Sequence, residues 1–144
     1  MLFRSIFYWM SQLFRAFALR QVLIASFALT VVRFVLIAWW VDSLLLLLLA
    51  QILHAASFGS FHAAALGYVH RFFRGRNQAR GQALYASLTF GLGGTLGGVY
   101  AGYAWERFGA GITFSGAALY AFAGMVILWL RLGDRNSAAA DAAN

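Results

Sequence analysis

Four apolar runs dominate this chain, at about residues 20–41, 43–69, 82–104 and 110–131. A helix needs about 20 predominantly apolar residues to cross a bilayer, and each run meets that length. Because backbone groups in lipid must be satisfied within their own segment, helices are the expected form. Only 10% of the residues are charged, against about 25% in soluble domains. We therefore predict an all-α integral membrane protein with four transmembrane helices.

The charged residues lie mainly at the ends of these runs, and arginine is concentrated in two of the connections. One group precedes the first run, and the other lies between the second and third runs: Arg4, Arg15, Arg20, Arg71, Arg74, Arg76 and Arg80. Cytoplasmic connections carry an excess of basic residues, which predicts a bacterial-type inner (plasma) membrane protein with both termini in the cytoplasm. We interpret the net charge of +7 as topology and contact with anionic lipid, not as nucleic-acid binding.

The two ends of the chain differ from the four-helix region, residues 20–132. Residues 1–19 form an amphipathic segment, which we interpret as the end of a preceding helix. Residues 133–144 are small and polar, which predicts a disordered cytoplasmic tail. The chain has no cysteine, which excludes disulfides and thiolate metal sites. No nucleophile–base constellation is visible, so we expect no cofactor, no metal and no enzymatic activity.

Arg33 is the charged residue in the interior of the first run. Ser26, Thr30 and Arg33 follow i, i+4, i+7 spacing, so one face of the predicted helix is polar. Ionisable groups in the membrane usually face a bundle interior or a watery cavity and mark a pathway. None of the four acidic residues lies at the same depth, so the partner would be a solute carboxylate or an acid on another chain. The alternative is an arginine that snorkels to the outer interface.

The second run carries Gln51, His54 and His62. At 100° per residue, His62 is rotated about 80° from His54, so the two histidines line one broad face. Histidine is neutral or charged near neutral pH, which suits substrate hydrogen bonding or proton relay. The alternative is two neutral histidines that are hydrogen-bonded within the bundle. We take Arg33, Gln51, His54 and His62 as candidates for substrate binding or proton coupling.

The third run contains a glycine stripe, formed by Gly94, Gly98 and Gly102. Small residues at this spacing let a neighbouring helix approach closely. We predict that the stripe is a helix-packing surface.

A resemblance to a known family rests on QILHAASFGSFHAAALGYVHRFF followed by RGRNQARGQALYASLTFGLGGTLGGVYAGYAWERFGAGITF. With the intramembrane arginine, this stretch resembles the last third of a major facilitator superfamily transporter, most like its phenylpropionate permease branch and more distantly lactose permease. The likeness covers about residues 13–132. It implies that the four runs are helices nine to twelve of a twelve-helix fold.

The resemblance also implies roles for single residues. Arg33 and His54 match positions of the network that couples protons to substrate in the sugar symporter, and His62 matches a second histidine of the phenylpropionate-type pattern. The sugar symporter has a glutamate one turn after the first histidine, where this chain has Ser57. The resemblance therefore carries over no proton-coupling carboxylate.

The sequence favours part of a secondary active transporter that moves a small organic solute across the inner membrane. Because Arg33 has no internal acid, an organic anion such as an aromatic acid is the expected solute. Expected partners are the lipid bilayer and either the missing N-terminal transporter part or further copies of the chain, and no nucleic acid. The alternatives are a non-transporting membrane scaffold or remnant, and a small homodimeric multidrug exporter.

Overall fold

The computed structural model describes residues 17–141, with side chains described for residues 17–131. These residues form helices and contain no strand, so the all-helical prediction is confirmed for the described part of the chain. The amphipathic segment 1–19 lies almost wholly outside the described residues. The disorder of residues 133–144 stays a prediction.

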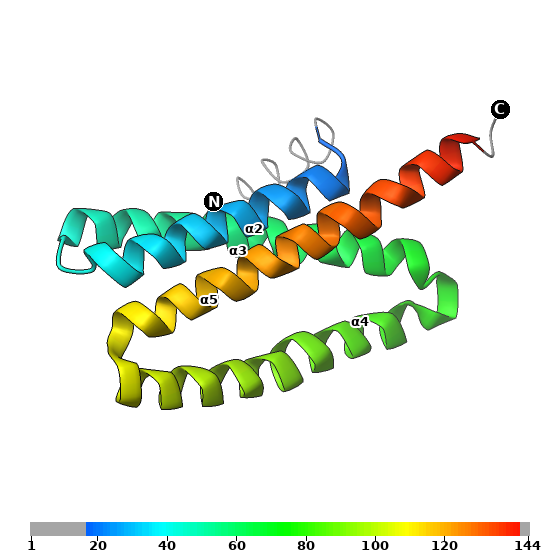
Figure 1. Cartoon of the computed structure of the whole chain (residues 1–144). Coiled ribbons are helices and arrows are strands. Elements are labelled where there is room, and N and C mark those ends of the chain that lie inside the picture. The colour runs from blue at the N-terminus through cyan, green and yellow to red at the C-terminus, as the bar shows by residue number, and fades with distance from the viewer. Residues whose placement is uncertain (1–16, 142–144) are drawn as a thin grey trace, which may run out of the picture.

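The first two helices, α2 (Leu19–Trp40) and α3 (Leu44–Phe72), form an antiparallel pair (Figure 1). The turn between them is closed by the amide of Ser43, which donates to the carbonyl oxygen of Trp40 at 3.2 Å. Their shared core contains Val22 and Leu23 from α2 and Ala64 from α3, all 5% exposed or less. A small alanine opposite branched side chains lets the two backbones approach closely.

Four further helical segments follow α3, beginning with a turn at Gly75, which has φ of 58°. The 3-10 turn η1 (Gly75–Asn77), α4 (Gln78–Ala86), the π-helix η2 (Ser87–Gly93) and α5 (Gly94–Asp141) follow one another along the chain. Because a positive φ strains any residue with a side chain, glycine is the residue suited to this turn.

The chain reverses direction within α5, at Gly109 (Figure 1). This residue has φ of 76° and ψ of 178°, a non-helical conformation that divides α5 into two arms. The second arm returns alongside α2 and packs against it. At the reversal, Gly111 lies so close to α2 that an added Cβ would be 3.3 Å from the carbonyl oxygen of Ala38.

Three helical stretches are long and apolar enough to cross a membrane: Leu19–Trp40, Leu44–Phe72 and Gly75–Arg131. The third has 57 residues and would be about 85 Å long if straight, against a hydrocarbon thickness of about 30 Å. The break at Gly109 instead folds it into two arms. These stretches fit a membrane helical protein.

Candidate functional site

A cavity of ≈ 200 Å³ lies between α2 and α3. Its polar lining comes from Ser26, Thr30 and Arg33 on α2 and from His54 and Ser57 on α3. Phe27, Phe58 and Phe61 complete its wall. We call it the Arg33 cavity. The helical spacing of the α2 residues places all three on the face that meets α3, so the structure brings Arg33 and His54 to one site.

Arg33 is the charged group of this cavity and is partly buried. Its Nε atom is buried and has no hydrogen-bond partner within the described residues. Its guanidinium carbon lies 4.3 Å from the centre of the Phe34 ring, a cation–π distance. A buried donor without a partner costs about 1–3 kcal/mol. No acidic side chain among residues 17–131 forms an ion pair with Arg33.

The hydroxyls along the α2–α3 contact are satisfied within the protein. Ser26 Oγ donates to the carbonyl oxygen of Val22 at 2.7 Å and lies 2.8 Å from Ser60 Oγ across the helix pair. Thr30 Oγ1 donates to the carbonyl oxygen of Ser26 at 2.8 Å. Since these protons are engaged, Ser26 and Thr30 present mainly acceptor lone pairs to the cavity. Donors for an anion therefore come from Arg33 and from a ring nitrogen of His54.

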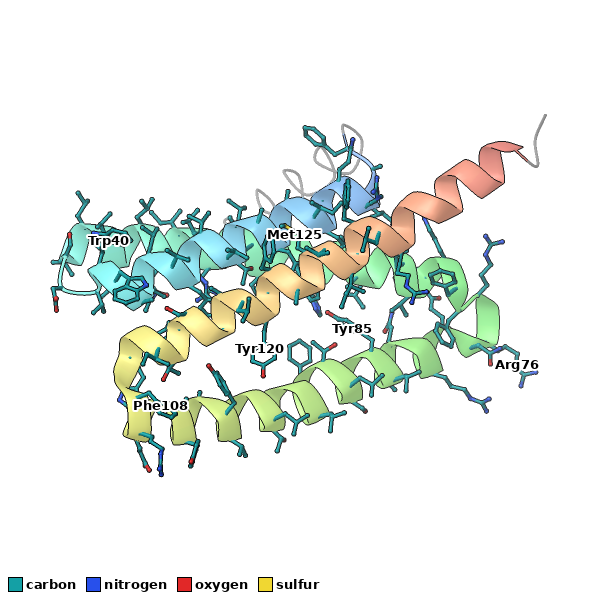
Figure 2. The ribbon with its side chains drawn as sticks, in the orientation of Figure 1. Trp40, Arg76, Tyr85, Phe108, Tyr120 and Met125 are labelled. Atoms are coloured by element: carbon teal, nitrogen blue, oxygen red, sulfur yellow. The ribbon has the colours of Figure 1, made fainter. Side chains whose placement is uncertain are left out.

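His54 and His62, two of the three histidines of α3, lie in different environments. His62 Nδ1 lies 3.0 Å from the phenolic oxygen of Tyr85, on α4. Its ring is also 5.9 Å from Phe90 and stacks on Phe58 at 6.1 Å with an interplanar angle of 5°. Tyr85 lies between its own helix and the helices opposite, as Figure 2 shows. Two of the four candidates, Gln51 and His62, do not line the Arg33 cavity. Gln51 is exposed.

Tyr85 and Phe90 were not found from the sequence. In an α-helix, residues five apart point in directions about 140° apart. The π-helix Ser87–Gly93 winds more loosely, and the two rings lie 6.3 Å apart. π-Helical segments are frequent at functional sites. In a run as hydrophobic as residues 82–104, the spacing of apolar residues does not distinguish a π-helix from an α-helix.

A larger aromatic pocket of ≈ 720 Å³ lies between α2 and the two arms of α5. Its aromatic lining is Phe27, Phe34, Tyr100, Trp105, Phe114 and Tyr120. Tyr100 donates its hydroxyl proton to the carbonyl oxygen of Thr113 at 3.1 Å, which ties the two arms together. Phe27 lines both this pocket and the Arg33 cavity.

A model of the MFS_1 like family matches residues 4–116. The chain belongs to the MFS_1 like family. This is a transporter family, not an enzyme family, and membership agrees with the membrane-length helices. No curated protein sequence and no solved structure matches the chain.

In this member of the MFS_1 like family, the glycine stripe Gly94, Gly98 and Gly102 is exposed. A Cβ added at any of the three would have no heavy atom within 4 Å. Other glycines are covered: a Cβ at Gly124 would be 2.8 Å from Phe27 Cε1. No described helix of this chain packs on the stripe, and its packing role stays a prediction.

Proposed function

We propose that the chain is part of a secondary active transporter that moves a small organic anion across the inner membrane. Membership of a transporter family supports this class of function. The observation that carries the proposal is the buried, unpartnered Nε of Arg33 in a cavity shared with His54. A cation at this depth is costly and typically marks a pathway.

The chemistry of the Arg33 cavity suits a carboxylate. A guanidinium presents several donors in a planar fork that matches the two oxygens of a carboxylate. Such charge-assisted hydrogen bonds contribute about 1.5–3 kcal/mol each. His54 lines the same cavity and would donate a further hydrogen bond through a ring nitrogen.

The size of the Arg33 cavity supports a solute whose anionic group lies in the cavity and whose remaining atoms lie outside it. Ligand pockets usually measure about 300–1,000 Å³, whereas the Arg33 cavity measures ≈ 200 Å³. It holds an anionic group and few further atoms. The aromatic pocket adjoins it at Phe27 and has room for a ring. We therefore propose an aromatic acid of the kind expected for the phenylpropionate permease branch.

Proton coupling in this proposal rests on histidine. The acidic residues of the described side chains, Asp42 and Glu106, lie at helix ends, away from Arg33. We assign this role to His54 in the cavity and His62 beside Tyr85, because a neutral imidazole carries one nitrogen that donates and one that accepts a hydrogen bond. Gln51 retains its proposed role only if another chain covers the exposed face of α3 on which it lies.

We further propose four membrane spans, with the two arms of α5 crossing separately and both termini in the cytoplasm. Arginine at one end of the helices supports this orientation. Alternating access uses two halves that rock around a site at their interface. The proposed assembly therefore needs an N-terminal transporter part or further copies of this chain.

Arg33→Gln tests the anion site, with Arg33→Lys and the exposed Arg107→Gln as comparisons. Membranes containing the full chain are titrated with radiolabelled benzoate, and neutral benzamide serves as competitor. Loss of charge-assisted hydrogen bonds is expected to weaken benzoate binding roughly 10–100-fold in Arg33→Gln. Arg33→Lys retains the charge but loses the fork, so an intermediate affinity is expected.

Arg107→Gln should bind benzoate as the wild type does, because Arg107 is exposed and lines neither the Arg33 cavity nor the aromatic pocket. Equal competition by benzamide, or wild-type affinity in Arg33→Gln, would contradict the anion site. A large fall in the membrane level of Arg33→Gln would instead support a packing role. If the Arg33→Gln variant functions in the host cell as the wild type does, the alternative of a non-transporting scaffold is favoured.

A further inference from the structure

The arginines of the described side chains are divided unequally between the two ends of the helices. Arg20 donates to the carbonyl oxygen of Trp129 at 3.0 Å, which places the start of α2 beside the late part of α5. The turn after α3 lies at the same end of the helices. The end of α3, this turn and the start of α4 carry Arg71, Arg74, Arg76 and Arg80, all exposed. We call these four residues the arginine turn.

Among the described side chains, the arginine turn has no acidic counterpart nearby. The two acidic residues with described side chains, Asp42 and Glu106, lie at the opposite end of the helices. The positive charge of the turn is therefore uncompensated within the described residues. Arg76 extends from the end of the molecule, clear of the helices (Figure 2).

The backbone of the arginine turn is held in place by specific contacts. Phe73 packs on Gly81 so closely that an added Cβ would lie 2.5 Å from Phe73 Cγ. His70 Nε2 and Gln82 Nε2 lie 2.9 Å apart and connect the two sides of the turn. These contacts fix the positions from which the arginines project. A binding group positioned in advance loses less entropy when it binds.

Aromatic side chains accompany the arginines at this end. Phe72 is 64% exposed, and its ring lies 6.3 Å from that of Tyr68. The guanidinium carbon of Arg71 lies 5.9 Å from the Tyr68 ring. Aromatic rings beside basic residues, at the end of a membrane-length helix, are typical of the level of the lipid headgroups.

We infer that the arginine turn binds the phosphate groups of anionic phospholipids. The turn connects two membrane-length stretches, so in the proposed topology its arginines lie at headgroup depth, where lipid is the most abundant ligand. Guanidinium groups match phosphate oxygens in pairs. Exposed Phe72 adds an apolar contact with the acyl region. A lipid surface uses both features, whereas a free phosphate uses only the charge.

The test uses the full chain, purified in a neutral detergent and titrated with phosphatidylglycerol or phosphatidylcholine. Binding is followed by the rise in the midpoint of thermal unfolding. Phosphatidylglycerol is expected to bind more tightly than phosphatidylcholine. Replacement of Arg74, Arg76 and Arg80 by glutamine should weaken phosphatidylglycerol binding roughly 100-fold, since each arginine near an anionic surface contributes about fivefold.

Two further variants separate the contributions of charge and geometry. Arg107→Gln removes one exposed charge at the opposite end and should leave the phosphatidylglycerol response unchanged. Gly81→Ala keeps all the arginines but displaces Phe73, so a response reduced severalfold is expected. An unchanged response in the triple variant would overturn the inference. An equal response to inorganic phosphate would overturn the assignment to lipid.

Discussion

Two glycines of α5 provide a matched test of helix packing. A Cβ added at Gly124 would lie 2.8 Å from Phe27 Cε1, whereas one at Gly98 would meet nothing within 4 Å. Favourable carbon–carbon contacts are about 3.5–4.0 Å. Gly124→Ala therefore places a methyl group about 0.7 Å too close to a ring that is packed edge-on against Phe61 at 5.5 Å.

The expected magnitudes follow from two terms. Replacing glycine by alanine within a helix stabilises it by about 0.5–1 kcal/mol, and this term is common to both variants. Overpacking costs about 1–3 kcal/mol and applies only to Gly124→Ala. Gly98→Ala should thus be neutral or slightly stabilised. Gly124→Ala should be less stable than Gly98→Ala by about 1–3 kcal/mol.

Unfolding of both variants by a denaturing detergent, followed by circular dichroism, measures the difference directly. Because helix propensity cancels between the two variants, the difference reports the contact with Phe27. Equal stabilities would refute the close approach of α5 to α2 at Gly124. Destabilisation of Gly98→Ala in the assembled protein would show that a partner helix packs on the glycine stripe.

The remaining predictions concern single hydrogen bonds and use the same unfolding measurement. Tyr85→Phe keeps the ring but leaves His62 Nδ1 without its partner, so a loss of about 0.5–1.5 kcal/mol is expected. Ser26→Ala should cost only about 0.6 kcal/mol, because Ser60 Oγ keeps its hydrogen bond to the carbonyl oxygen of Ala56 at 2.6 Å.

A neutral Tyr85→Phe variant would contradict the hydrogen bond between α3 and α4. Tyr68→Phe on α3 is a suitable control, because it removes a phenolic hydroxyl elsewhere. A loss above about 2 kcal/mol in Ser26→Ala would exceed an interhelical hydrogen bond in a membrane protein. It would indicate instead that the serine fills space between α2 and α3 that alanine leaves empty.

The apolar runs predicted much of the fold, because the length of each run can be counted directly from the sequence. The runs at 20–41 and 43–69 correspond to α2 (Leu19–Trp40) and α3 (Leu44–Phe72). The third run, expected from 82, begins inside α4, which already starts at Gln78. The residues at the start of α4 are polar, so hydropathy averaged along the sequence does not assign them to a membrane-length helix.

The candidate site was less predictable, because spacing along one helix does not say where the neighbouring helices lie. The angle of about 80° between His54 and His62 predicts that both line one broad face of the helix. In the structure, His54 lines the cavity between α2 and α3 whereas His62 lies beside Tyr85 of α4, so spacing along α3 alone does not assign both histidines to one cavity. The aromatic pocket depends on the reversal at Gly109, which brings together two arms that the sequence treats as independent.

The anion that we propose for Arg33 has two candidate sources, a solute carboxylate or an acid on another chain, and stability measurements distinguish them. If an acidic residue of another chain were the permanent partner, Arg33→Gln would leave that acid buried and unpaired. Breaking a buried ion pair in this way costs about 3–5 kcal/mol, so the assembly would unfold or dissociate far more readily. If the partner is a solute carboxylate, no charge is left behind in the empty protein. Arg33→Gln would then lose benzoate binding while the solute-free assembly stays as stable as the wild type or becomes more stable, because an unsatisfied buried donor has been removed.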